Sequence, residues 1–320
     1  MNPSKNPEDR LWAVLSHLSS LAFGMGVFLP IVGWSEQRRK SNYVSFQTLQ
    51  ALGYQSLGFT VWVLSYLVVL IVVLILLIVM SFQAEKSGKP FNPFLGPGAI
   101  LSFIVLFGFF IIYFLLPIIA AVACAIGKEF RYPILGDRLA RYLDYDPSQK
   151  PEEQIWLNEE HEFRWVAAMG HFSILIILWG MLAPLTTWIL YGKRSPLLRF
   201  QAIQTLVYQA GTTVIYFGGL FIYLFGFLFL FAGLGIIRGQ TVNSPGEVFG
   251  LFGFGLSLCV SFALILLVPC LHILGQWAGY RVLKGDDYEY PLIGKFIEKQ
   301  MAGQSLLGAE SGPGLKGESS

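Results

Sequence analysis

The sequence predicts an all-α, polytopic integral membrane protein, in which two tandem helical repeats form a pseudo-symmetric bundle. Three observations predict this fold class: an apolar composition, long segments without charge, and an internal repeat. Of the 320 residues, 54% are hydrophobic and only 13% are charged, and the mean hydropathy is +0.59. Soluble domains carry about twice that charged fraction.

Four long segments contain no Lys, Arg, Asp or Glu, and they are residues 42–84, 90–127, 200–237 and 248–280. Each is longer than the roughly 20 apolar residues that cross a bilayer. Their apolar residues run without a one-sided stripe, so we expect lipid or other helices on every side of them. These lengths exclude the buried strand or core helix of a soluble protein.

The chain repeats itself after 154 positions, and the match includes rare polar residues that shared hydrophobicity does not explain. The two copies end alike, because Tyr132-Pro133 recurs as Tyr290-Pro291 at an offset of 158. The aligned pairs include Arg10 and Arg164, His17 and His171, Pro30 and Pro184, Trp34 and Trp188, Gln50 and Gln204, and Tyr54-Gln55 and Tyr208-Gln209.

Each copy therefore contains three apolar segments, and six result: residues 11–34, 43–83 and 98–127, then 165–190, 200–236 and 249–280. Charged residues and prolines between the copies predict a solvated linker that includes a short surface helix at most. The Gly/Ser-rich end of the chain predicts disorder. The expected organisation is a polar N-terminus (1–10), a first membrane repeat (11–136), a charged cytoplasmic linker (137–162), a second membrane repeat (163–297) and a disordered tail (298–320).

Basic loops follow the first apolar segment of both copies, which favours a cytoplasmic position for both loops. Three full crossings per copy would place them on opposite sides. One resolution is a first segment that enters and returns as a broken helix, at Gly24-Met25-Gly26 and Pro30 or at Gly180 and Pro184. The alternative is six full spans in an inverted repeat, as in transporters. We favour parallel copies in the plasma (inner) membrane with both termini cytoplasmic.

Polar residues inside the apolar segments are the candidate functional positions, because polar groups at membrane depth are costly. His17 and His171 have two possible roles. They form a proton-responsive or ligand-contacting site, or they stay neutral and hydrogen-bond a neighbouring helix. The remaining positions form one stripe per copy, which either lines a cavity between the copies or joins helices by hydrogen bonds. These are Gln47, Gln50, Tyr54 and Gln55 in the first copy, and Gln201, Gln204, Tyr208 and Gln209 in the second.

No catalytic motif is present: the sequence lacks H-E-x-x-H, G-x-S-x-G, C-x-x-C and a phosphate-binding loop. We therefore expect no enzyme activity, no catalytic residue, no metal and no cofactor. The near balance of 22 basic and 20 acidic residues gives no reason to expect nucleic acid. The expected partners are the lipid bilayer and either another membrane protein or a second copy of this chain.

The chain resembles an uncharacterised family of small bacterial membrane proteins, which is related to the Tic-type translocon subunit of the chloroplast inner envelope. The resemblance rests on His17-Leu18-Ser19, on Phe46-Gln47 with Gln50-Ala51-Leu52, and on Glu129-Phe130-Arg131-Tyr132-Pro133, and both copies carry it. Gln47 and Gln201 stand where family members often have His. The resemblance implies a helical membrane protein of bacterial type and hints at a channel or assembly role.

The sequence thus predicts a non-enzymatic membrane scaffold or assembly factor. The alternative is a transport, channel or translocon-like component that uses the polar stripes. The absence of Asp, Glu, Lys and Arg from the long apolar segments argues against ion-coupled transport, because such carriers keep an ionisable group near mid-membrane.

Overall fold

A computed structural model describes residues 6–88, 97–147, 156–233 and 245–310, with the backbone alone at 97–102, 105–106 and 302–310. The described chain is helical and contains no strand. The α-helices are α1 (Pro7–Leu18), α2 (Phe28–Gln37), α3 (Asn42–Ser87), α4 (Pro97–Ala125), α5 (Leu135–Tyr142), α6 (Glu159–Phe172), α7 (Leu182–Tyr191), α8 (Pro196–Gly233), α9 (Pro245–Leu283) and α10 (Ile293–Glu310).

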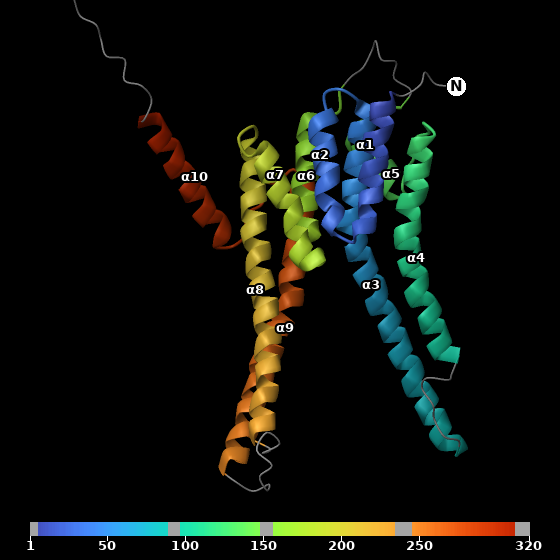
Figure 1. The fold of residues 1–320 in the computed structure, drawn as a ribbon, viewed down its shortest axis with the longest axis vertical. Coiled ribbons are helices and arrows are strands. Elements are labelled where there is room, and N and C mark those ends of the chain that lie inside the picture. The colour runs from blue at the N-terminus through green and yellow to red at the C-terminus, as the bar shows by residue number, and fades with distance from the viewer. Residues whose placement is uncertain (1–5, 89–96, 148–155, 234–244, 311–320) are drawn as a thin grey trace, which may run out of the picture.

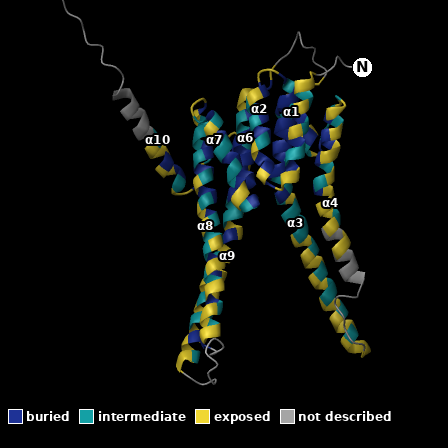
Figure 2. Cartoon of the chain, in the orientation of Figure 1, coloured by how far each residue is buried: buried dark blue, intermediate teal, exposed yellow. Residues whose placement is uncertain are grey.

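The molecule has a packed head and two legs (Figure 1). The short helices α1, α2, α5, α6 and α7 lie in the head beside the adjoining halves of the long helices. The far halves extend from the head as legs, α3 with α4 and α8 with α9. Figure 2 shows the buried residues gathered in the head and the exposed ones along the legs.

The first apolar segment of copy one is a broken helix that turns back on itself. The turns η1 (Ser19–Ala22) and η2 (Met25–Val27) separate α1 from α2, which pack together. Phe23 and Gly24 between them have φ angles of +46° and +89°. Glycine adopts this conformation without strain, and a Cβ on Gly24 would overlap Ile176 of copy two. The break thus lies at the glycines where the sequence predicts it.

The second copy breaks at a different residue. Its turn η4 (Ser173–Met181) has its non-helical residue at Ile177, with φ of +48°, three positions before the predicted Gly180. The Ser173 hydroxyl donates to the carbonyl oxygens of Gly170 at 2.6 Å and Gly180 at 2.9 Å. These bonds join both sides of the turn, so the surrounding contacts hold an isoleucine in a conformation that costs about 1–3 kcal/mol.

The two copies run in the same direction. The α2–α3 connection and the α7–α8 connection lie at the same end of the molecule (Figure 1). The arrangement is therefore parallel and not an inverted repeat. Five described helical stretches are long and apolar enough to cross a membrane, and the third contains the η4 turn: 42–87, 107–125, 159–191, 196–233 and 245–283.

The long helices exceed the thickness of a bilayer. With 46 residues, α3 is about 69 Å long, whereas the hydrocarbon core measures about 30 Å. Its first half, through Phe59, is buried in the head. Its most apolar window has a mean hydropathy of 3.4, and none of that window is buried by protein. Each long helix therefore serves both as a core helix and as a lipid-facing one.

The two legs pack differently. In the second, α8 and α9 approach closely: Gly233 and Gly250 face each other without room for a Cβ on either. The Ser261 hydroxyl also donates to the Gly219 carbonyl at 2.7 Å. Small residues and such hydrogen bonds are the usual means of helix association in membranes. The exposed half of α3 has no glycine between Phe59 and Ser87.

Two predicted irregular regions are more ordered than expected. The linker predicted to be solvated from residue 137 contains most of α5, whose Leu139 is fully buried beside Leu143 in the core between the copies. The tail predicted to be disordered from residue 298 is helical as far as Glu310, and residues 311–320 lie outside the described residues. Helix-forming residues and a buried Ile297 against α8 account for α10.

Cysteine labelling in intact cells tests the parallel arrangement. In a cysteine-free background, Lys40→Cys and Lys193→Cys occupy exposed positions beside the two basic loops. We expect both to resist an impermeant maleimide outside and to react after permeabilisation. Lys86→Cys, at the far end of α3, is the control that should react from outside. Labelling of only one basic loop from outside would contradict the parallel arrangement.

Candidate functional site

The candidate histidine of copy one lies in a closed set of hydrogen bonds between three segments. His17 on α1 is fully buried, and its Nε2 lies 3.0 Å from Oε1 of Gln47 on α3. Its Nδ1 lies 3.1 Å from the hydroxyl of Tyr132, in the loop after α4. Gln47 Nε2 in turn donates to the Phe130 carbonyl at 3.0 Å. The cluster thus ties α1 to the long helix α3 and to the loop after α4.

The other stripe positions of copy one extend the same contacts. Gln50 donates to the Phe130 carbonyl and accepts from the Tyr132 backbone N–H at 2.8 Å. Tyr54 stacks on Tyr132 with ring centroids 4.1 Å apart. Gln55 donates to Ser19 Oγ at 2.8 Å and so holds the start of the helix break. All four stripe residues therefore face the inside of their own copy.

Copy two repeats this cluster at the equivalent residues. His171 Nε2 lies 3.0 Å from Gln201 Oε1, and its Nδ1 lies 2.9 Å from the Tyr290 hydroxyl. Gln204 donates to the Tyr288 carbonyl at 2.7 Å and accepts from the Tyr290 N–H. The remaining contacts are Tyr208 stacked on Tyr290 at 3.9 Å and Gln209 donating to the Gly170 carbonyl at 2.8 Å.

The geometry suits a neutral histidine in each copy. An amide oxygen can only accept, so His17 donates from Nε2 to Gln47, and Nδ1 then accepts from the Tyr132 hydroxyl. Burial raises the pKa of Tyr132 and of Tyr290 well above the usual range, so both phenols keep the proton that they donate. Within the described residues, no group of three or more His, Cys, Asp or Glu is placed to hold a metal ion.

The structure brings all ten candidate residues together, in two clusters of five, but it does not place either cluster between the copies. Sequence reasoning missed the partners Tyr132 and Tyr290 as cluster members, although the recurring Tyr-Pro pair was a signal for them. It also missed Thr205, whose hydroxyl lies 3.0 Å from His171 Nδ1. The clusters thus connect helices within each copy.

A buried ion pair joins the two copies. The Arg38 guanidinium after α2 donates to Glu162 of α6 at 2.9 Å, and the Trp34 indole donates to the other Glu162 oxygen at 3.0 Å. Arg38 also lies over the Phe163 ring, 4.5 Å from its centroid. Burial lowers the pKa of Arg38, but the Glu162 carboxylate and Tyr191 together leave that pKa above its ordinary value.

A tryptophan fills a hole beside this pair. A Cβ on Gly53 would lie 2.6 Å from Trp165, so the glycine admits the indole of copy two. Trp165 Nε1 donates to the Leu49 carbonyl at 3.0 Å. Trp34 and Trp165 lie near segment ends, which is typical of membrane-interface anchors, but both are buried between the copies.

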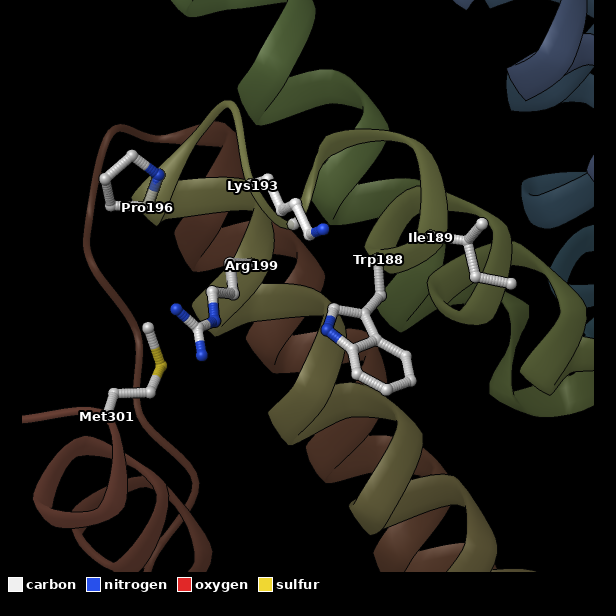
Figure 3. Close-up of a pocket in the computed structure, with 7 residues that line it drawn as sticks. Trp188, Ile189, Lys193, Pro196, Arg199 and Met301 are labelled. Atoms are coloured by element: carbon white, nitrogen blue, oxygen red, sulfur yellow. The ribbon is translucent and has the colours of Figure 1, made fainter. Parts of the chain in front are cut away.

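A pocket with a volume of about 640 Å³ lies at the edge of copy two (Figure 3). Trp188, Ile189, Lys193 and Arg199 line one side of it, and Met301 of α10 lines the other. Neither histidine cluster opens into it. This pocket is therefore separate from the residues that the sequence nominated.

Comparison with known proteins identifies one family. The model of the magnetosome magnetite crystal formation protein family matches residues 8–139 and 162–297, which are the two copies. No curated protein and no solved structure matches the chain. The match supports a membrane-associated family present in two copies, and it does not show the relationship to the Tic-type subunit.

Removing a cluster glutamine should destabilise the protein. Gln50→Leu leaves the buried Tyr132 N–H without its acceptor, and Gln204→Leu does the same to Tyr290. We expect each to lose about 1–3 kcal/mol, seen as a lower thermal unfolding midpoint in detergent micelles. The control Gln83→Leu changes an exposed glutamine on the α3 leg and should leave the midpoint unchanged. Equal midpoints for all three variants would contradict the structural role.

The ion pair between the copies gives a second test. Arg38→Met leaves the Glu162 carboxylate buried without its cation, and it should cost about 3–5 kcal/mol in unfolding measurements. The double variant Arg38→Met/Glu162→Leu should lose less than either single change, because no buried charge then stays unpaired. The matched control Arg39→Met breaks only the exposed pair with Glu159 and should cost less than about 1 kcal/mol. Additive losses in the double variant would refute this account.

Proposed function

Because this chain belongs to the magnetosome magnetite crystal formation protein family, we propose that it is a non-enzymatic membrane scaffold or assembly factor. The family description names a process and no reaction. In that process, the proposed role of this chain is to stay fixed in the membrane and to organise other components. We place it in the plasma (inner) membrane, with the basic α2–α3 and α7–α8 connections on the cytoplasmic side.

One observation carries this proposal: the polar residues at membrane depth serve the protein's own fold. In each copy the histidine and the two glutamines nearest it bind one another and the backbone of a single loop. A transport pathway needs polar groups that face water or substrate. A scaffold needs a rigid arrangement, which such closed networks provide.

The contact between the copies supports the same function. A channel between parallel repeats would run along their interface, but the ion pair of Arg38 and Glu162 and the indole of Trp165 occupy it. The alternative function, a transport, channel or translocon-like component, therefore requires the copies to separate. The kinship with the Tic-type subunit stays a prediction from the resemblance.

Reconstitution separates the two functions. Purified protein is placed in liposomes that contain a trapped fluorescent anion or a potassium gradient. As a scaffold, the wild-type protein should give no flux above that of empty liposomes. The variant Arg38→Met/Glu162→Leu is measured in parallel, because loosening the interface would open any path that runs along it. A wild-type flux that disappears in Gln50→Leu/Gln204→Leu would overturn the scaffold proposal and favour transport.

A further inference from the structure

The pocket of about 640 Å³ at the edge of copy two is lined by two cations. They are Lys193, in the α7–α8 connection, and Arg199, near the start of α8. The Trp188 indole lies beside them and carries its Nε1 on the side of Arg199 (Figure 3). The volume is within the roughly 300–1,000 Å³ that small-molecule sites occupy. Because two cations beside one space repel each other, the pocket favours an anion.

The equivalent loop of copy one already binds anionic groups. The Trp34 indole, at the position of Trp188, donates to the Glu162 carboxylate at 3.0 Å. Arg39, at the position of Lys193, pairs with a second carboxylate of α6 at 2.7 Å. An indole N–H and a cation at these two positions therefore bind carboxylate oxygens within this protein.

The loop of copy two is more basic and more open than that of copy one. Arg199 stands where copy one has Ser45, which adds a cation. Trp188 is 42% exposed, whereas its equivalent in copy one is fully buried. Among the described residues, no carboxylate forms an ion pair with Lys193. The carboxylates of α6 thus serve copy one, and copy two presents the same donor groups outward.

Apolar surface continues from the pocket along the outside of α8. Arg199 is the last charged residue before the charge-free segment 200–237. Val207, Val214 and Phe221 follow at intervals of seven residues, which places them on one helix face, and they are 46%, 70% and 62% exposed. The cations therefore lie at the end of an exposed apolar stripe, as a lipid headgroup lies at the end of its acyl chains.

A phospholipid phosphate matches the donor groups of the pocket. Phosphate oxygens accept hydrogen bonds from ammonium, guanidinium and indole N–H groups, and arginine binds phosphate through two parallel bonds. Pro196, in the first turn of α8, also lines the pocket, and the start of a helix favours an anion. Basic pockets beside membrane helices bind anionic headgroups in this way. A choline or ethanolamine headgroup would add a cation of its own, so the charges favour an anionic lipid.

We propose that this pocket binds one anionic phospholipid, with its phosphate between Lys193, Arg199 and the Trp188 indole and an acyl chain along the apolar stripe of α8. The site belongs to copy two, because the carboxylates of α6 occupy the equivalent place in copy one. This inference goes beyond the scaffold function, and it holds equally for a transport component.

Lipid titration of the full chain in a non-ionic detergent tests the site, with bound lipids counted by native mass spectrometry. Phosphatidylglycerol should bind the wild-type protein at least about tenfold more tightly than phosphatidylcholine. Lys193→Gln/Arg199→Gln should lower the affinity for phosphatidylglycerol about 25-fold, because each cation near a headgroup contributes about fivefold. The swap Lys193→Arg/Arg199→Lys keeps both charges and should bind as the wild-type protein does.

The matched control is Arg39→Gln/Lys40→Gln, which removes two cations from the equivalent loop of copy one. It should leave the affinity for phosphatidylglycerol unchanged. Equal affinities of the wild-type protein for the two lipids would overturn the proposal. So would a swap variant that no longer binds, or a loss in the control as large as that in the double glutamine variant of copy two.

Thermal unfolding separates a lipid from a free anion. Phosphatidylglycerol should raise the unfolding midpoint of the wild-type protein in micelles, because a ligand that binds only the folded state stabilises it. Glycerol 3-phosphate and inorganic phosphate carry the charge without acyl chains and should give no rise at the same concentration. An equal rise with inorganic phosphate would refute the lipid assignment. No rise with any of the three would refute the anion site itself.

Discussion

The fold depends on one constraint: every polar group that leaves water must find its partner inside the protein. The break in the first segment of each copy makes this constraint acute, because it interrupts the helix and frees backbone groups. At the breaks the structure meets it in part, through Gln55 on Ser19 and Ser173 on two carbonyls, whereas Gln55 Oε1 and Gln209 Oε1 have no hydrogen-bond partner. Next to the breaks, the histidine and glutamine clusters hold the loop after the third segment of each copy by hydrogen bonds to its backbone. Because these bonds connect every segment of a copy, the apolar contacts of the head can form around a defined backbone.

Much of this arrangement is visible in the sequence. The charge-free segments predicted membrane helices, the offset of 154 predicted two like units, and the conflict between charge and parity pointed to a broken first segment. Helical periodicity also gathered Gln47, Gln50 and Tyr54 on one face. Periodicity shows which residues share a helix face but not which group packs on that face. Here that group is the Phe130 carbonyl, which lies 80 or more residues from Gln47 and Gln50 in the sequence. For the same reason the pairing of Trp34 with Glu162 and the packing of α10 on α8 were not predictable from local pattern.

The two copies are alike inside and different outside. Their clusters share the histidine, the glutamines and the tyrosines at equivalent positions, and copy two adds Thr205 beside His171 where copy one has Ala51. At the surfaces the equivalent residues differ. Gly53 of copy one corresponds to Val207 of copy two, and Leu11 of copy one corresponds to Trp165 of copy two. Such divergence is expected after duplication, because one copy must recognise the other while their outer sides meet a different environment.

The unequal legs have a consequence for the surrounding membrane. In copy two the legs α8 and α9 close on each other through glycine and serine, so protein atoms complete that hairpin. In copy one the most apolar window of α3 has no protein neighbour that buries it, and acyl chains must take that place. Lipid therefore contacts more of α3 in copy one, although the apolar windows of α8 and α9 are themselves only 11% buried. A change in chain length or saturation of the bilayer should therefore alter the spacing of α3 and α4 more than that of the closely packed α8 and α9.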